Sequence, residues 1–155
     1  MAKHTNMHRR SLLAASSSLL ILTSGCLSES RSSSLETVND PPEWLSEDND
    51  CEIGYAAGYL SLSGRNEDVG DSVAVVDYNE LTDHSKLLVR YSVENGIAKS
   101  CSNEVPFMDF LREIDNLALE PYRDENNHGP DTTSIHAAGG YYNIVRLAAS
   151  DVVFS

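Results

Sequence analysis

Three histidines have a carboxylate nearby in the sequence, which is the pairing that proton-transfer chemistry would use; they are His84, His128 and His136. Ser134, His136 and Asp131 together have the residue types of a nucleophilic triad. These three fall within six positions of a predicted hairpin strand, where alternate side chains share a face without meeting head-on. The chain also lacks a G-x-S-x-G nucleophile turn. We therefore predict no catalytic residues, and a hydrolase assembled from Asp131, His136 and a distant partner remains an alternative.

A metal ion would need His, Cys or carboxylate ligands at a characteristic spacing. The stretch DENNHG (124–129) has the first residues of a calcium loop, but its twelfth position is Ile135, where such a loop requires a bidentate glutamate. A metal-cargo protein, the second alternative, would have to bring one of the three histidines to Cys51 or Cys101. Neither cysteine has another Cys or His within four residues. We predict no metal site and no cofactor.

Cys51 and Cys101 remain once Cys26 is assigned to the leader described below. An even pair of cysteines in an exported chain favours a disulfide, which here would close a loop of about 50 residues. Two free thiols or metal ligation are the other interpretations. The expected bridge would stabilise the fold by up to about 4 kcal/mol in the chain-entropy model.

Four tyrosines flank glycines in two short stretches, GYAAGY and GGYY; they are Tyr55, Tyr59, Tyr141 and Tyr142. Tyrosine combines a large apolar ring with a polar tip, so clusters of it are favoured at recognition surfaces. The simpler interpretation is that these tyrosines populate half-buried strands. We take the four as a candidate recognition surface.

The first 25 residues have the pattern of an export signal. Arg9 and Arg10 precede an apolar run of eleven residues from Leu12 to Leu22, and no acidic residue occurs before Glu29. A membrane-spanning helix needs roughly 20 apolar residues, so this run fits the core of a signal peptide instead. The arginine pair predicts the twin-arginine route, which exports folded proteins.

The apolar run ends Leu22-Thr23-Ser24-Gly25-Cys26. Ser24, Gly25 and Cys26 resemble the lipobox of prokaryotic lipoproteins, although Thr23 stands where an aliphatic residue is usual. With the arginine pair, residues 1–26 resemble the exported lipoproteins of halophilic archaea. The resemblance implies that Cys26 is lipidated and holds the protein on the outer face of the cytoplasmic membrane. Without lipidation, the protein would be secreted.

The chain is strongly acidic, with 24 Asp and Glu against 11 Lys and Arg and a net charge of −13. Removal of residues 1–25 takes away Lys3, Arg9 and Arg10, leaving eight basic residues and a net charge of −16. This charge excludes a nucleic-acid binder, because affinity for phosphate needs clustered Lys and Arg. The acids are scattered, which favours solubility in concentrated salt over a dedicated cation-binding surface.

The rest of the sequence predicts a tether over 26–48 and one small domain over 49–155. Serine, acid and the Pro41-Pro42 pair dominate the tether, although Trp44 and Leu45 could dock on the domain. The sequence predicts a strand at VAVVDY (73–78). It predicts a helix that begins at Thr82 or Asp83 and ends at Asn95-Gly96. A second helix is predicted at VPFMDFLREIDNL (105–117), where Pro106 stands in the first turn. A polar loop over 120–131 and a hairpin across Gly139-Gly140 follow.

These elements predict an α+β domain with two helices on an antiparallel sheet that ends in a C-terminal hairpin. From about Val75 onward, VVDYNEL, the ENG helix stop and the Gly-Gly-Tyr-Tyr hairpin resemble a small haloarchaeal domain of unknown function. The resemblance implies the same compact α+β unit and no chemistry. We therefore expect an anchored extracytoplasmic lipoprotein, whose module binds a ligand or assembles with an envelope protein.

Overall fold

The computed structural model describes residues 34–45, 51–150 and 152–154. Six strands form one sheet: β1 (Gly58–Leu62), β2 (Val73–Asp77), β3 (Ile97–Ser100), β4 (Thr132–Ala137), β5 (Gly140–Ala149) and β6 (Val152–Phe154). The order is β2-β4-β5-β1-β3, with β6 paired to the last residues of β5. The predicted α+β fold, its largely antiparallel sheet and its C-terminal hairpin strands are confirmed.

One strand pair departs from the predicted antiparallel arrangement. β2 and β4 run parallel, with Val75 opposite Ser134 and Asp77 opposite His136. All three α-helices and β3 lie between these two strands in the chain, so the chain crosses the sheet and enters β4 from the same end as β2. The predicted hairpin joins β4 to β5, and Ala138 and Gly139 form its turn with positive φ.

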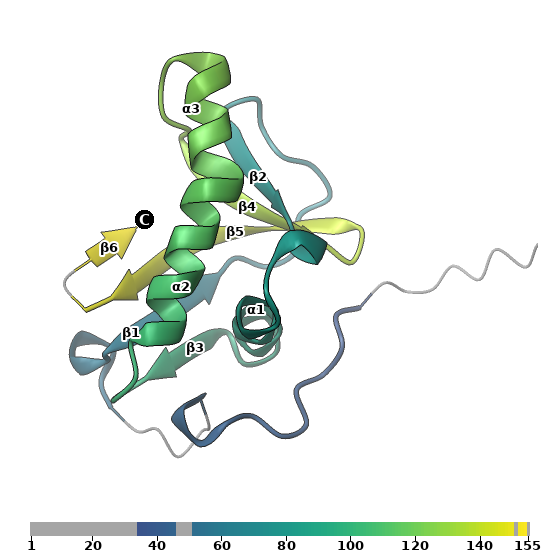
Figure 1. Cartoon of the computed structure of the whole chain (residues 1–155). Coiled ribbons are helices and arrows are strands. Elements are labelled where there is room, and N and C mark those ends of the chain that lie inside the picture. Colours follow the sequence, from purple (N-terminus) through teal and green to yellow (C-terminus); the bar gives the residue numbers. More distant parts are fainter. Residues whose placement is uncertain (1–33, 46–50, 151, 155) are drawn as a thin grey trace, which may run out of the picture. The chain divides into compact units, whose positions relative to one another are not determined.

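The helices lie on one face of the sheet (Figure 1). Helix α1 (Asp83–Asn95) begins at the predicted cap, where the Thr82 hydroxyl accepts from the Ser85 amide, and it ends at Gly96 in the left-handed conformation. Helix α2 (Val105–Ile114) runs directly into a π-helical turn (Asp115–Leu119) and then into α3 (Glu120–Asn126). Short 3-10 turns occupy Glu43–Leu45 (η1), Ile53–Tyr55 (η2) and Tyr78–Glu80 (η3).

α2, the π turn and α3 together form one helical rod. This rod is longer than the predicted second helix, because α3 occupies much of the expected loop over 120–131. Pro121 has no amide hydrogen, so it breaks the regular α-helical hydrogen-bond pattern. The chain widens into a π turn just before it, in which the Glu120 amide donates to the Asp115 carbonyl. The rod therefore continues past the proline and ends at Asn127, which is left-handed at φ 58°.

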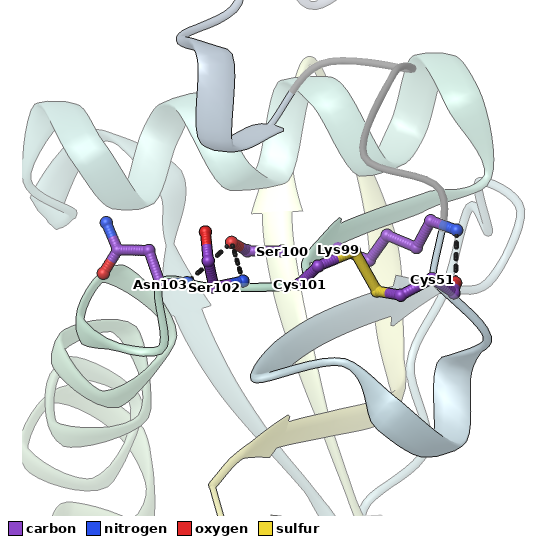
Figure 2. Close-up of a disulfide and its surroundings, with 6 residues drawn as sticks. All are labelled: Cys51, Lys99, Ser100, Cys101, Ser102 and Asn103. Atoms are coloured by element: carbon purple, nitrogen blue, oxygen red, sulfur yellow. Dashed lines mark hydrogen bonds between the residues drawn. A yellow bond between two sulfur atoms is a disulfide. The ribbon is translucent and has the colours of Figure 1, made fainter.

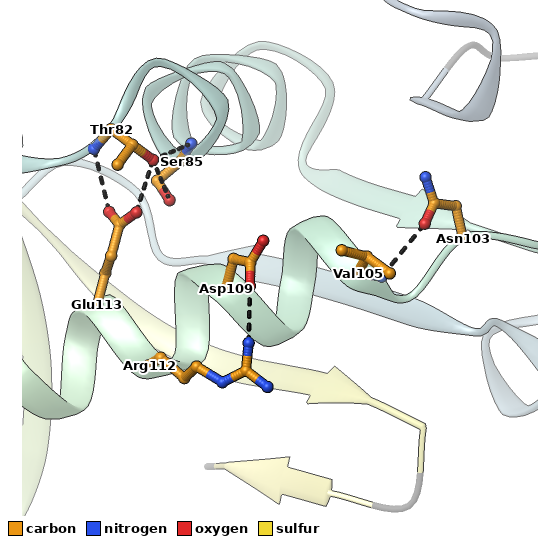
Figure 3. Close-up of polar contacts among 7 residues, drawn as sticks. All are labelled: Thr82, Ser85, Asn103, Val105, Asp109, Arg112 and Glu113. Carbon is orange, nitrogen blue, oxygen red and sulfur yellow. Dashed lines mark hydrogen bonds and ion pairs between the residues drawn. The ribbon is translucent and has the colours of Figure 1, made fainter.

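Glu113 fixes the two helices to each other at the start of α1. Its carboxylate accepts from the Thr82 amide at 3.1 Å and from the Thr82 hydroxyl at 2.6 Å (Figure 3). The amide is one of the unpaired donors at a helix start, which favours a negative charge there. Since Glu113 lies in the last turn before the π segment, this contact also sets the direction of the helical rod beyond it.

Cys51 and Cys101 form a disulfide with Cα atoms 5.8 Å apart, as predicted. The bridge joins the chain just before η2 to the residue that follows β3 (Figure 2). Lys99 reinforces it, because its ammonium donates to the Cys51 carbonyl at 2.7 Å. The Ser100 hydroxyl accepts from the Asn103 amide at 3.0 Å and turns the chain toward α2.

Part of the predicted tether is packed on the domain. Leu45 is 1% exposed within the core, and the ring of Trp44 lies edge-on to Phe107 at 6.2 Å. The segment also contacts α1, because the Val38 amide donates to Glu94 and Arg90 pairs with Glu36, both at 3.1 Å. Docking of Trp44 and Leu45 is confirmed. The prediction of a free tether is wrong for residues 34–45, because apolar side chains of this segment are buried on the domain. The predicted signal peptide and Cys26 lie outside the described residues.

Gly58 is required by close packing between the sheet and α2. A Cβ atom at this position would overlap the ring of Phe107, which is completely buried. We expect Gly58→Ala to lower the free energy of unfolding by about 1–3 kcal/mol, measured by urea denaturation, because overpacked cores strain. Gly64→Ala is the matched control, since a Cβ there meets nothing within 4 Å. Equal stability of the two variants would contradict this account of the packing.

Reduction of the disulfide should destabilise the domain. The loop it closes spans 50 residues, so we expect reductant to lower the free energy of unfolding by up to about 4 kcal/mol. Urea unfolding with and without reductant measures the difference. The double variant Cys51→Ser/Cys101→Ser should unfold identically in both conditions, and a reductant effect on that variant would show a cause other than the bridge.

Candidate functional site

A cavity of about 190 Å³ lies between the helical rod and the sheet. It is enclosed by the π turn, α3, the loop before β4, and strands β4, β5 and β6. Its lining residues are Leu119, Arg123, Gly129, Pro130, Asp131, Thr132, Thr133, Ile144 and Phe154. The sequence prediction missed this cavity, because its walls come from several separate segments spread over residues 119–154.

Three large apolar side chains form one part of the cavity wall. Leu119 belongs to the π turn and is 5% exposed, while Ile144 projects from β5 toward the helices and is 3% exposed. Phe154 on β6 completes the wall and packs against the core cluster. β6 therefore has a direct role in the site, because it brings the end of the described chain against the helical rod.

The wall of the cavity includes a residue whose hydroxyl is unsatisfied. Thr133 is 1% exposed, and its Oγ1 has no hydrogen-bond partner among the described residues. Strand alternation explains its position, since Thr133 and Ile135 share the side of β4 that faces the helices. A buried hydroxyl without a partner costs roughly 1–3 kcal/mol, so this side chain weakens the unliganded fold.

Two charged side chains are on the exposed edge of the cavity. Arg123 is paired with Asp115 at 2.9 Å across the π turn, and its side chain is 49% exposed. Asp131 is exposed, and its backbone amide donates to the Ser72 carbonyl at 2.8 Å. Within the described part of the chain its carboxylate has no ion pair or hydrogen bond.

The opposite face of the sheet carries a row of polar contacts. His136 Nδ1 is 4.0 Å from Asp77 Oδ2, and its ring lies 4.9 Å from that of Tyr141. The Ser134 hydroxyl donates to Asn143 Oδ1 at 2.5 Å. Asp131 lines the cavity on the helix side, so it does not join His136. The structure thus pairs His136 with Asp77, which comes from the parallel strand that the sequence did not predict.

The metal-cargo alternative required a histidine to meet a cysteine. Cys51 and Cys101 are bonded to each other, which leaves neither as a thiolate ligand. His128 contacts the Gly129 carbonyl and stacks edge-on with Tyr122 at 5.8 Å. Over residues 34–45, 51–150 and 152–154, no three His, Cys, Asp or Glu side chains are grouped to hold a metal ion.

The four tyrosines do not form one exposed surface. Tyr55 is 80% exposed on η2, but Tyr59 and Tyr142 are only 5% and 7% exposed. Tyr141 and Tyr142 are neighbours on β5 and therefore point to opposite faces. Tyr59 lies under the Arg146 guanidinium, 5.2 Å from the ring centroid. The candidate recognition surface is corrected accordingly, since strand alternation separates its members.

A second cavity of about 240 Å³ lies between residues 34–37 and α1. Its three charged side chains already have partners, since Arg90 pairs with Glu36 at 3.1 Å and Glu94 accepts from the Val38 amide at 3.1 Å. It is therefore a weaker candidate than the cavity around Thr133.

Comparisons with known proteins found no matching family model, no matching curated protein and no matching solved structure. The described helices include none with the length and apolar character needed to span a membrane. Inferences about function therefore depend on the residues and their geometry.

Thr133→Val tests the cost of the unsatisfied hydroxyl. Valine keeps the shape and removes the polar atom, so we expect the free energy of unfolding to rise by about 1 kcal/mol in urea denaturation. Ser134→Ala, one residue along, should have the opposite effect, because it removes the donor to Asn143 at a fully buried position. A loss of stability in Thr133→Val would contradict this view of the site.

Proposed function

We propose that the domain is a small-molecule binding module of an exported, lipid-anchored protein. The observation that carries the binding function is the Thr133 hydroxyl, which is buried without a partner in the wall of a cavity that Leu119, Ile144 and Phe154 also line. Buried polar groups are normally hydrogen-bonded, so an orphan at a cavity is a candidate ligand contact. Because this hydroxyl has no exposed surface in the free domain, the Thr133 side chain would have to turn toward the cavity for a ligand to supply the missing hydrogen bond.

The size of the cavity limits the ligand to a small organic molecule. An apolar cavity of roughly 150 Å³ holds benzene, so about 190 Å³ suits a single ring or a short branched chain. Leu119, Ile144 and Phe154 would contact its apolar body. Small-molecule sites typically combine such walls with a few polar groups that fix orientation.

Export is supported by the leader and by the disulfide. Disulfides persist in oxidising compartments, and Cys51–Cys101 is such a bond in a chain with an N-terminal export pattern. In this proposal residues 1–25 are removed and Cys26 becomes the lipidated N-terminus on the outer face of the cytoplasmic membrane. The acidic charge supports a surface adapted to solubility and argues against nucleic acid as a partner.

An interaction module that docks on an envelope protein is the second candidate function. Exposed apolar side chains favour it: Val145 on β5, Val152 and Val153 on β6, and Tyr55 on η2 are each at least 46% exposed. Scattered exposed apolar residues are common on soluble domains, so this observation is weaker than the orphan hydroxyl.

An NMR titration of the purified full chain with 3-methylbutanol tests the binding function. This neutral probe offers a branched apolar body and a hydroxyl for Thr133. We expect saturable shifts confined to residues of the Thr133 cavity, including the methyl groups of Leu119 and Ile144. Leu35 and Val93, which line the second cavity, serve as the internal control. No saturable shift, or shifts centred on the second cavity, would disprove this site.

Mass spectrometry of the membrane-extracted protein tests the anchor. We expect a mature chain that starts at Cys26 and carries added acyl mass, with the protein in the membrane fraction. Cys26→Ser should abolish the added mass and release the protein from membranes. Cys51→Ser/Cys101→Ser is the control, because it removes the two other cysteines and should leave the anchor intact. A chain that starts elsewhere would contradict lipidation.

A further inference from the structure

The three α-helices lie on one face of the sheet, so strand side chains on the other face lie outside the helical layer (Figure 1). We call this second surface the open face. Strand register assigns residues to it, because side chains directly opposite each other on paired strands share a face. Its exposed or half-buried members include Val75 and Asp77 on β2, His136 on β4, Val145 and Arg146 on β5, and Val153 on β6.

A bulge in β5 places two neighbouring side chains on the open face. The pairing of β5 with β1 skips Val145, which is therefore an extra residue. Ile144 and Leu147, on either side of the bulge, are only 3% and 0% exposed. Val145 is 55% exposed, and Arg146 beside it is also exposed. An apolar side chain and a cation therefore lie side by side on the middle strand of the sheet.

Two more exposed valines belong to the open face. Val75 on β2 is 38% exposed, and Val153 on β6 is 58% exposed. Val153 pairs with Ala148 of β5, which itself lies opposite Tyr59 on the open face. Its neighbour Val152 points to the helix side, because side chains alternate along a strand. Burial of apolar area is the main driving force of protein association, so these valines favour a covered face.

The open face also differs in charge from the rest of this acidic chain. The chain has 24 Asp and Glu, yet Asp77 is the one carboxylate among the residues of the six strands. The three α-helices carry more carboxylates than cations, so they would repel another acidic protein. Of the helical layer and the sheet, the open face is therefore the surface where two copies of the chain repel each other least.

Asp77 and Arg146 make the open face complementary to itself. One strand separates β2 from β5, and the two residues are about four positions apart along the sheet, so they lie roughly 16 Å apart. The Asp77 side chain is 45% exposed, and no carboxylate of the described residues pairs with Arg146. A twofold axis in the interface, midway between the two, would bring Arg146 of each copy to Asp77 of the other.

We propose that the open face binds a second copy of this chain through the same face. The two sheets would stack about 10 Å apart, with the helices on the outside, as in a β-sandwich. Asp77 argues against an acidic partner of another kind, and the valines argue against a purely polar one. The Thr133 cavity lies on the helix side of the sheet, so this pairing and the proposed binding function can fail separately.

Sedimentation velocity of the purified full chain measures the association. Every sample carries Cys26→Ser, so that neither an anchor nor an intermolecular disulfide joins the chains. We expect a monomer–dimer equilibrium at micromolar to millimolar concentrations, because small interfaces associate weakly. Each chain has a net charge of −13, and salt screens the resulting repulsion. The dimer should therefore tighten, by about tenfold between about 0.1 M and 1 M NaCl.

Val145→Glu and Val152→Glu form a matched pair of variants. Both replace an exposed valine of the sheet and change the net charge equally, but only Val145 lies on the open face. Val145→Glu should weaken the dimer by about tenfold or more, because a carboxylate would be buried beside Asp77 of the other copy. Val152→Glu should associate like the parent chain. Urea denaturation of both variants checks that they remain folded.

Arg146→Gln tests the ion pairs of the twofold arrangement. We expect the dimer to weaken about fivefold at about 0.1 M NaCl, because two exposed ion pairs are lost. Arg112→Gln is the matched control, since Arg112 is an exposed cation of α2 and its loss makes the same change in net charge. It should leave the dimer intact.

The outcomes decide between a second copy and other occupants. A chain that stays monomeric at every concentration and salt would overturn the proposal and leave the open face to a partner of other chemistry. Equal effects of Val145→Glu and Val152→Glu would place any dimer on another surface and would also overturn it. A dimer that Arg146→Gln leaves unchanged or tightens would rule out the pairing of Arg146 with Asp77.

Discussion

The missing amide hydrogen of Pro121 is the constraint on which the site depends. An uninterrupted α-helix needs that donor, and the rod from Val105 to Asn126 continues only because one π turn absorbs the defect. The wider turn shifts the angular position of every later residue relative to α2. Leu119 and Arg123 lie over the start of β4 as a result, and the Arg123–Asp115 ion pair spans the turn. Single π turns inside α-helices are often found at functional sites, and here the turn forms one wall of the cavity.

The elements with strong local signals could be predicted from the sequence. Thr82 and Gly96 marked the ends of α1, and Gly139-Gly140 marked the hairpin, because capping and turn chemistry depend on a few neighbouring residues. The Cys51–Cys101 disulfide could be predicted because these are the two cysteines that remain once Cys26 is assigned to the leader. The pairing of β2 with β4 could not be predicted, since it joins strands more than 50 residues apart and depends on the route of the chain across the sheet.

The site was harder to predict than the fold. Asp131 lies close to His136 in the sequence, which favours pairing the two, yet in the structure Asp131 lines the cavity and His136 contacts Asp77. One sequence signal for the site is Thr133, a polar residue on the same side of its strand as the buried Ile135. The tyrosines drew attention through their number, but their burial depends on packing that composition does not reveal.

The position of the disulfide determines how the domain would respond to a mechanical pull on its N-terminal side. A force applied there reaches residues 34–45 first, and the contacts that hold this segment include the buried Leu45, two polar contacts to α1 and the Trp44 ring. These contacts can break one after another. The force then meets Cys51, where a covalent bond transfers it to Cys101 at the end of β3. The 50-residue loop between them, which includes α1 and three of the six strands, is shielded from tension. The helical rod and β4 to β6 would have to resist the remaining force, so extension of the segment need not open the interior of the loop.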